Sequence, residues 1–526
     1  MRSMGALRSF RLSGNNPLVS IATFLVVIYA GYKAGQMVLA NDLTTLEFIG
    51  FVAAGGAVVV AILNDWRRGL YALVAWILFE DFVRKYLGNN MMIYFGKDIL
   101  ALVIYLSYFR ARRGRGLEKF RVPFRVALLL FVWFGVIQVF NPSSKSIFYG
   151  ILGMKVDFIY IPLVYIGYTM LESEEELHRF FSYLCVLFLI VSGLGLAQSI
   201  IGPSFLNPSR LQDDIRDLSM LYKVAPISGL VAYRPTSVFV SASRFGDFLI
   251  FAWAISLGFG GYLLLRSRKG RALAFTTVGV VAAASLMTAS RGVFMWNGGI
   301  ALVVAAGFLW GAPWRQREAL RVMRAIQRTA IMVACGIVLL LTIFPKELGS
   351  RMAIYSETLL PNSPTSELVH RTQTYPWQQL NYALLYPDWP WGYGLGTCTL
   401  GIQYVIRIMH APPMGIGVES GYGNLLLELG IVGLLLWIFL GISIVVSAAK
   451  VVRELKGTPW FPLSFTICLY AAILWFPMMF TGVSAYQDFV LNASLWLMLG
   501  VLFRLRTFPK AAALAQRQTV AATRRA

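Results

Sequence analysis

The sequence predicts an all-α integral membrane protein with about 12–14 transmembrane helices and one large periplasmic loop before the last helices. Of its 526 residues, 57% are hydrophobic and only 14% are charged, and the mean hydropathy is +0.65. Apolar runs of roughly 17–25 residues recur along the chain, which is the length that crosses a bilayer as a helix. The spans must be helical because lipid offers backbone groups no hydrogen-bond partners.

Fourteen segments are candidates for spans, and because the third is short and the last ones are close together, twelve or thirteen remain alternatives. The first follows Arg2, Arg8 and Arg11 and has an apolar run longer than that of an ordinary signal peptide, so we expect a retained signal anchor. The segments are 17–37, 46–63, 69–83, 94–109, 124–140, 149–171, 180–202, 245–265, 272–289, 293–310, 329–345, 421–449, 462–480 and 487–503.

The formal net charge of +22 is unevenly distributed. Basic residues are densest in the connections 110–125, 266–271 and 315–328, all on the same side of the predicted membrane. This is the positive-inside bias, and it places both termini in the cytoplasm. The basic residues therefore favour contact with anionic membrane lipid, and we expect no nucleic-acid partner.

The chain divides into four parts. Residues 1–345 hold the N-terminal helices and an outer loop at 203–243, residues 346–420 form the large outer loop, residues 421–505 hold the last helices, and the Ala/Arg-rich tail 506–526 is expected to be disordered. Such a long loop is usually functional or disordered, and its many aromatic residues favour order.

Within the large loop, residues 366–386 predict an amphipathic helix. Pro376 limits that helix, so two short helices are an equal alternative. The turn that follows contains Gly392, Gly394 and Gly396, which permit positive φ and a close approach of the backbone to a ligand.

Metal and disulfide chemistry are not predicted. The four cysteines are scattered, with three in predicted spans, so no disulfide is expected. The three histidines have no partners at the spacing of a zinc site.

Glu419 stands where the large loop meets an apolar helix, and its nearest basic neighbours are Arg407 and Lys450. An ionisable residue at a membrane boundary is a functional-site hypothesis. The helix N-terminus should favour its carboxylate form and the expected burial near lipid should oppose it, a balance that suits a general base. The alternative is that Glu419 only interacts with the first turn of the helix.

Several short motifs occur in a familiar order: Lys97-Asp98-Ile99-Leu100, Arg234-Pro235-Thr236-Ser237-Val238-Phe239, Ser290-Arg291-Gly292, the glycine turn at 392–396, and the segment from Glu419 to Gly433. In this order and in its topology the chain resembles the O-antigen ligase and O-antigen polymerase superfamily. The resemblance implies an inverting, metal-independent glycosyltransferase without a cofactor, facing the periplasm in the bacterial inner membrane. Its donor would be a polyprenyl-diphosphate-linked glycan and its acceptor a glycan or a lipid. Ligases usually carry a histidine near the position of Glu419, so polymerase, ligase and divergent transferase all stay open.

In that reaction Glu419 is the candidate general base, with His410 as the alternative. Tyr422, also a candidate substrate-binding residue, lies three residues after Glu419 on the same helical face, where it is expected to hydrogen-bond the carboxylate or to serve as an interfacial tyrosine.

Arginine suits a diphosphate because its planar fork is always charged. Arg291, Arg234, Arg371 and Arg244 are therefore the candidate substrate-binding residues. Three of them have a structural alternative: an interfacial anchor for Arg291, loop packing for Arg234, and an ion pair with Asp247 at i+3 for Arg244.

A transporter or flippase is the alternative function, with Asp98, Asp157 and Glu428 lining the pathway. The absence of an internal repeat and of evident broken helices argues against it. In the enzyme interpretation Glu428 is a helix-packing residue, hydrogen-bonded to Asn424 at i−4. A non-catalytic assembly protein is a third hypothesis.

Overall fold

The computed structural model describes residues 58–87, 91–115, 120–207, 221–266, 269–311, 342–360, 363–482 and 485–508, with a few isolated residues besides. The predicted span 17–37, most of 46–63 and 329–345, and the tail after residue 508 lie outside these ranges. The described part is mainly helical, with a single two-stranded sheet.

The chain forms two compact units, and α3 (Trp66–Tyr86) and α4 (Met91–Arg115) each contribute to both. The first unit comprises residues 1–74 and 96–117. In it, the Ser107 hydroxyl donates a 2.9 Å hydrogen bond to the carbonyl of Ile62, and the rings of Trp66 and Tyr108 meet edge to face at 5.3 Å. These contacts hold its two helical segments together.

The second unit contains the other elements. Its helices are α5 (Arg125–Gln138), α6 (Ile147–Phe158), α7 (Leu163–Thr169), α8 (Glu174–Ile201), α9 (Ala242–Arg266), α10 (Arg271–Met287), α11 (Arg291–Gly311), α13 (Pro345–Leu359), α14 (Tyr375–Leu384), α15 (Ile402–Ile408), α16 (Gly421–Glu454), α17 (Phe461–Trp475), α18 (Pro477–Thr481) and α19 (Phe489–Leu505). Six described segments are long and apolar enough to cross a membrane: 147–169, 174–201, 242–266, 291–311, 421–454 and 461–481. An all-α protein with membrane-spanning character is thus confirmed.

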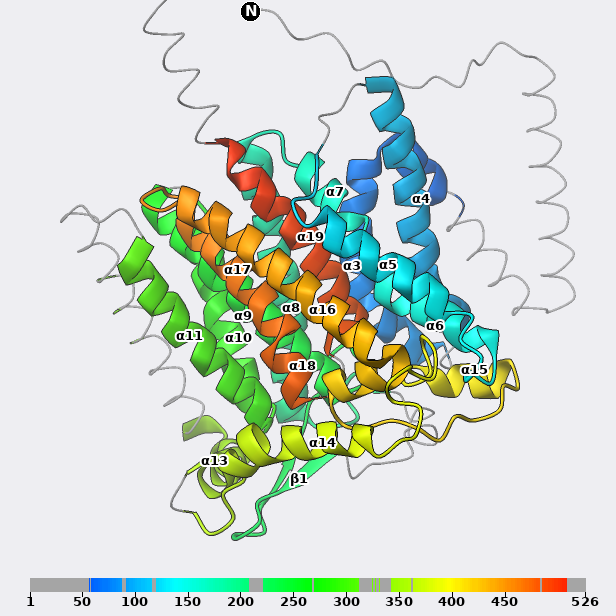
Figure 1. Cartoon of the computed structure of the whole chain (residues 1–526). Coiled ribbons are helices and arrows are strands. Elements are labelled where there is room, and N and C mark those ends of the chain that lie inside the picture. Colours follow the sequence, from blue (N-terminus) through cyan, green and yellow to red (C-terminus); the bar gives the residue numbers. More distant parts are fainter. Residues whose placement is uncertain are drawn as a thin grey trace, which may run out of the picture. The chain divides into compact units, whose positions relative to one another are not determined.

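Helix α9 is the centre of the second unit. It packs against α17, α10, α11 and α8, and most of its side chains are buried (Figure 1). Gly258 and Gly261 permit the close approach of α17, since an added Cβ would overlap Thr466 and Pro462. Small residues at helix contacts are the usual means of close packing between membrane helices.

Three of the predicted spans are interrupted. The segment 149–171 is divided into α6 and α7, 462–480 into α17 and α18, and α16 contains a non-helical residue, Gly430, with φ 69° and ψ −173°. The sequence interpretation had found no broken helices, because a glycine within an apolar run does not reveal the conformation of its backbone.

The glycine-rich turn packs into the break in α16. The N–H groups of Tyr393 and Gly394 donate to the carbonyls of Leu427 and Glu428 at 2.7 and 3.0 Å. Gly392, Gly394 and Gly396 have φ of 82°, 101° and 83°, as the sequence predicted. However, the backbone atoms that these glycines approach closely belong to α16 and α6, and not to a ligand. The turn therefore fixes the position of α16, the helix that begins beside Glu419.

Strand β1 (Tyr222–Val224), strand β2 (Val231–Tyr233), α13 and α14 gather at one end of the second unit (Figure 1). The strands are antiparallel and pair Lys223 with Ala232. Arg351 of α13 fastens this end, since its guanidinium donates to the carbonyls of Met287, Ser199 and Tyr233 at 2.7, 3.3 and 2.9 Å. Two of these carbonyls end α10 and α8, where a cation is favoured by the helix dipole.

The predicted amphipathic helix is present and continuous across Pro376. Residues 370–374 form a π-helical turn that leads into α14, so the proline lies in the first turn of α14, where a missing N–H is tolerated. Ala383 and Leu380 of α14 pack on Leu426 and Leu427 of α16.

Candidate functional site

Glu419 directly precedes α16. The hydroxyl of Ser420 caps that helix by accepting from the N–H of Gly423 at 3.3 Å, and the N–H of Glu419 donates to Oε1 of Gln379 at 2.8 Å. The Glu419 side chain is exposed, so the expected burial near lipid is wrong, and its carboxylate accepts a hydrogen bond from the hydroxyl of Tyr375. Contacts from the large loop therefore fix the predicted base at both its backbone and its side chain.

Tyr375 connects Glu419 to a cation. Burial and the hydrogen bond to Glu419 raise the pKa of the Tyr375 hydroxyl, so it stays protonated and donates. The guanidinium of Arg371 lies 4.5 Å from the centre of the tyrosine ring, within the range of a cation–π contact.

Arg371 and Arg291 share one carboxylate, that of Glu367. Oε2 of Glu367 lies 2.7 Å from a terminal nitrogen of Arg291 and 3.4 Å from Nε of Arg371. Burial works to raise the pKa of Glu367, but the two arginines outweigh it and the pKa is lowered. Arg291 begins α11 and Arg371 lies in the π-helical turn, so the structure brings together two residues that are far apart in sequence.

Lys223 and Arg234 of the hairpin region join them. The pKa of Lys223 is lowered to about 7, first by burial and then by the positive charges of Arg291, Arg234 and Arg371, which Glu367 opposes. Arg234 follows β2, and its N–H pairs with the carbonyl of Leu221 at 2.7 Å, next to Lys223. We call Lys223, Arg234, Arg291 and Arg371 the cationic group.

The electrostatic balance of the cationic group favours an anion. The carboxylate of Glu367 forms ion pairs with Arg291 and Arg371, and its charge also acts on Lys223, so three cations share this one carboxylate. Like charges held close together and partly buried are unfavourable without a counter-ion. A multivalent anion such as a diphosphate would relieve this repulsion, and arginine forks match its geometry.

Two other predicted residues lie apart from this cluster. The hydroxyl of Tyr422 donates to the backbone carbonyl of Trp475 at 3.1 Å, so the expected hydrogen bond to Glu419 is wrong, and Tyr375 takes that place. His410 has φ of 50° and an exposed side chain, and it precedes a segment that packs on Tyr149 of α6 through Ala411 and Met414.

Arg244 also has a different environment from the cationic group. Its terminal nitrogen lies 2.5 Å from Oδ2 of Asp81 and its Nε lies 2.8 Å from Oδ2 of Asp488. The expected partner Asp247 is therefore wrong, because carboxylates from α3 and from the cap of α19 satisfy both sides of the guanidinium fork. Arg84 shares Asp81 at 2.6 Å.

Glu428 is buried and does not bond to Asn424 as expected. Its Oε1 accepts from the N–H of Cys398 at 2.9 Å and from the hydroxyl of Thr399 at 2.8 Å, so it binds the segment after the glycine turn. The amide of Asn424 instead accepts from the N–H of Val418 at 2.9 Å.

Asp157 of α6 is linked to Glu428 through polar side chains. Gln487 is hydrogen-bonded to Asp157 and donates to Thr399 at 3.2 Å, and Thr399 donates to Glu428. Asp98, the third acidic residue expected to line the pathway of a transporter, belongs to the first unit. The described residues contain no cluster of three or more metal-binding side chains.

Sequence reasoning missed Tyr375, Glu367 and Lys223 as members of this site. The signal for Tyr375 and Glu367 was the predicted amphipathic segment itself, which carries Arg371 between them. For Lys223 it was the alternation of Tyr222-Lys223-Val224 and Val231-Ala232-Tyr233 around Gly229, typical of a hairpin that ends beside Arg234.

No protein-family model matches this chain, and no curated protein matches it either.

Proposed function

We propose that this protein is a membrane glycosyltransferase of the O-antigen ligase/polymerase type, which moves a polyprenyl-diphosphate-linked glycan to a glycan or lipid acceptor. The observation that carries the proposal is the proximity of a carboxylate base to a cationic group. Glu419, Tyr375, Arg371, Glu367 and Arg291 form a continuous chain of contacts at one end of the helices.

Each part has a role in the proposed transfer. Glu419 takes the proton of the acceptor hydroxyl as its oxygen forms a bond to the anomeric carbon. The bond from that carbon to the diphosphate oxygen breaks at the same time, and the diphosphate leaves with the electron pair, which inverts the anomeric configuration. Arg291, Arg371, Arg234 and Lys223 stabilise the negative charge that the leaving group gains. Tyr375 positions Glu419.

The finer topology belongs to the same proposal. We infer twelve to fourteen spans in the inner membrane of a bacterium, with both termini in the cytoplasm and the cationic group facing the periplasm. The basic connections 110–125, 266–271 and 315–328 support this orientation. An outward-facing site would meet a lipid-linked donor after its translocation.

The test is complementation of cells that lack the native gene, with wild type, Glu419→Gln or Glu347→Gln at matched membrane levels. Glu347→Gln is the control because that carboxylate also lies in the large loop, in the first turn of α13. The readout is a gel of lipid-linked and surface polysaccharide. Wild type and Glu347→Gln should make long glycan and Glu419→Gln should not.

The glycan that accumulates in the Glu419→Gln variant identifies the reaction. Accumulated short lipid-linked repeat units indicate a polymerase, and long lipid-linked chains without their acceptor indicate a ligase. Unchanged long glycan in Glu419→Gln would refute the assignment of the base.

The transporter remains the second candidate because of one observation. Asp157 lies at the end of α6 just before its interruption, Glu428 lies two residues before the break at Gly430, and both carboxylates are buried. Interrupted helices beside buried charges are typical of transport sites. In that case Asp157→Asn should abolish output while Glu419→Gln retains it.

A further inference from the structure

The outer side of α14 and the turn after it carry large apolar side chains that are well exposed among the described residues. We call Trp377, Tyr382, Leu384, Leu385 and Trp391 the apolar strip; their exposed fractions are 59%, 52%, 42%, 77% and 79%. The opposite side of α14, with Ala383 and Leu380, already packs on α16. Helix α14 therefore has a second apolar face that the described residues leave largely uncovered.

The composition of the segment excludes an ordinary solvated surface. Residues 375–387, Tyr-Pro-Trp-Gln-Gln-Leu-Asn-Tyr-Ala-Leu-Leu-Tyr-Pro, contain no charged side chain. Exposed loop helices usually carry charges on the water side. Tryptophan and tyrosine mixed with leucine and uncharged polar residues are typical of the boundary between hydrocarbon and headgroups.

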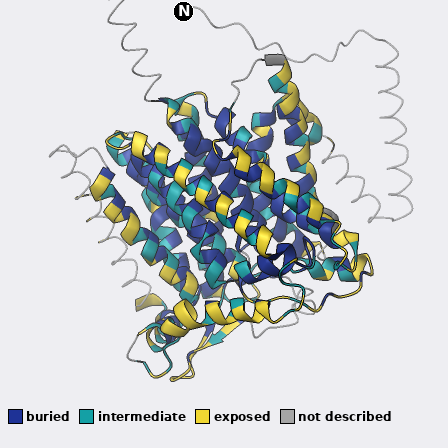
Figure 2. Ribbon diagram, in the orientation of Figure 1, coloured by how far each residue is buried: buried dark blue, intermediate teal, exposed yellow. Residues whose placement is uncertain are grey.

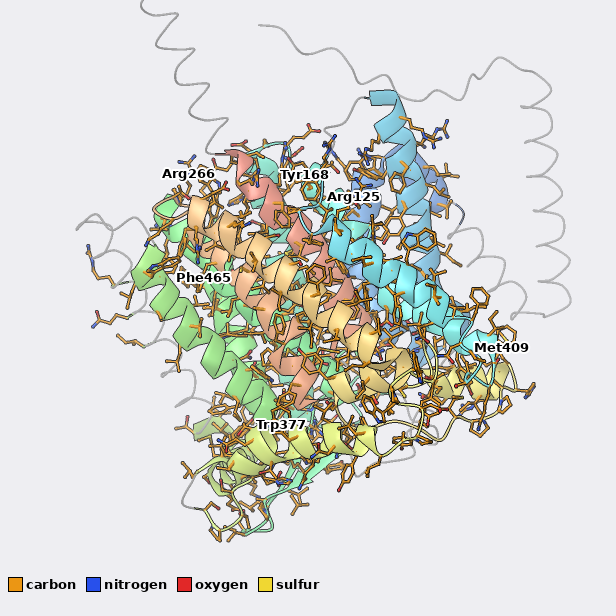
Figure 3. The ribbon with its side chains drawn as sticks, in the orientation of Figure 1. Arg125, Tyr168, Arg266, Trp377, Met409 and Phe465 are labelled. Carbon is orange, nitrogen blue, oxygen red and sulfur yellow. The ribbon has the colours of Figure 1, made fainter. Side chains whose placement is uncertain are left out.

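The position of the apolar strip continues the outward face of the helices long enough to span a membrane. The Trp377 ring packs edge-on against Phe480, 5.1 Å between centroids, at the end of the apolar segment 461–481. Trp377 is labelled in Figure 3. Trp391 lies against the break in α16, where a Cβ added to Gly430 would be 2.6 Å from its carbonyl carbon.

Beyond that break, exposed positions recur along α16 (Figure 2), and a regular series of them is apolar. They recur at helical spacing, so they form one stripe along the span. The series is Ile431, Val432, Leu435, Phe439, Ile442 and Val446, each at least 39% exposed. The backbone of Pro390 and Trp391 lies beside Gly430 and Ile431, so the apolar strip borders the start of this stripe.

We propose that the apolar strip docks onto the bilayer surface, so that α14 lies in the interface as an amphipathic helix beside the spans. The lipid that covers the outward stripe of α16 would extend over Trp391 and Leu385. Such helices bury their apolar face at the boundary of headgroups and acyl chains. The proposal does not depend on the reaction assigned to Glu419.

The test places a spin label at Leu385→Cys and at Trp391→Cys in the full-length protein reconstituted in phosphatidylcholine vesicles. The matched control is Ile227→Cys, an apolar residue at the tip of the hairpin with 58% exposure. Relaxation by oxygen, which concentrates in lipid, is compared with relaxation by a water-soluble nickel complex. The unsubstituted protein, treated with the same label, supplies the background from the native cysteines.

The ratio of oxygen to nickel accessibility should be several-fold higher at Leu385→Cys and Trp391→Cys than at Ile227→Cys. Equal ratios at the three positions would show that the strip faces water and would overturn the proposal. Exclusion of both reagents from the strip would also overturn it, since it would show a protein cover. As a measurement without a label, Trp391→Phe should reduce the part of the tryptophan fluorescence that brominated lipid quenches; an unchanged quenched part would contradict the proposal.

Discussion

Substitution of Gly392 by alanine should destabilise the protein far more than the same substitution at Gly415. Both glycines have positive φ, 82° and 68°, so alanine is strained by its backbone at either position. That strain costs about 1 kcal/mol at each. The difference lies in the surrounding space: a Cβ at Gly392 would lie 2.6 Å from the carbonyl oxygen of Glu428 and 2.6 Å from the nitrogen of Gly430, whereas at Gly415 nothing lies within 4 Å.

The neighbours of Gly392 are backbone atoms, which cannot rotate away as a side chain can. Forcing them apart adds about 1–3 kcal/mol, the usual cost of overpacking. Gly392→Ala should therefore lose about 2–4 kcal/mol and Gly415→Ala about 1 kcal/mol. Since the same turn donates to the carbonyls of Leu427 and Glu428, its displacement also loosens the start of α16.

The assay is thermal unfolding of both variants and of wild type in one detergent, followed with a dye that reacts with newly exposed thiols. Cys185 is a free, buried thiol, so its reaction with the dye reports unfolding directly. Gly392→Ala should unfold at a clearly lower temperature than Gly415→Ala. If the two variants shift equally, the close packing of the glycine turn into the break of α16 contributes nothing to stability and the reasoning is refuted.

Three further results are expected. Tyr375→Phe removes the hydroxyl that donates to Glu419 and should lower glycan output by up to about tenfold at unchanged membrane levels, as measured on gels; unchanged output would exclude a positioning role. The pKa of Lys223 is lowered to about 7, so its ammonium is charged below that pH and neutral above it. The affinity for sulfate, whose own charge is constant, should therefore fall from about pH 6 to about pH 8, as measured by calorimetry. Lys223→Gln should remove that pH dependence. A pH dependence that persists in the variant would show that another group titrates. Arg244→Met removes the cation that joins two buried carboxylates, of which Asp81 keeps Arg84 while Asp488 loses its ion-pair partner, and it should cost about 3–5 kcal/mol in thermal unfolding. Arg266→Met, at a partly exposed ion pair, should cost no more than about 1 kcal/mol, and equal losses would contradict this ranking.

The helices could be predicted from sequence because their signal is local. The apolar run 245–265 corresponds to α9 at 242–266, and 293–310 corresponds to α11 at 291–311. Length and hydropathy suffice to identify such elements. The backbone of a single glycine does not follow from them, so the break at Gly430 was missed although the run 421–449 was found.

The candidate site was predictable in part. Arg291, Arg234 and Arg371 were selected for the chemistry of their fork, and the structure brings all three to Lys223. Their shared carboxylate was not foreseen, because the contact between Glu367 and Arg291 joins the large loop to the start of α11. The sequence placed both on one side of the membrane but gave no measure of their distance.

The errors have one physical origin. Arg244, Tyr422 and Glu428 were each assigned a partner three or four residues away in the same helix, the spacing at which exposed side chains meet. A partly buried guanidinium needs more than one such neighbour, because each donor withdrawn from water and left unpaired costs free energy. Asp81 and Asp488 approach Arg244 from two other elements and satisfy both edges of its fork.

The buried carboxylate of Glu428 follows the same logic. An i−4 asparagine could offer it a single amide, whereas the segment after the glycine turn supplies the Cys398 N–H and the Thr399 hydroxyl together. In a membrane protein, an ionisable residue within an apolar run therefore predicts a partner on another element, and a local partner should be expected only where the side chain reaches water. By that rule Glu419, exposed at the end of a loop, could exchange Tyr375 for an acceptor hydroxyl in the proposed reaction, whereas Arg244 and Glu428 cannot leave their partners without a large loss of stability.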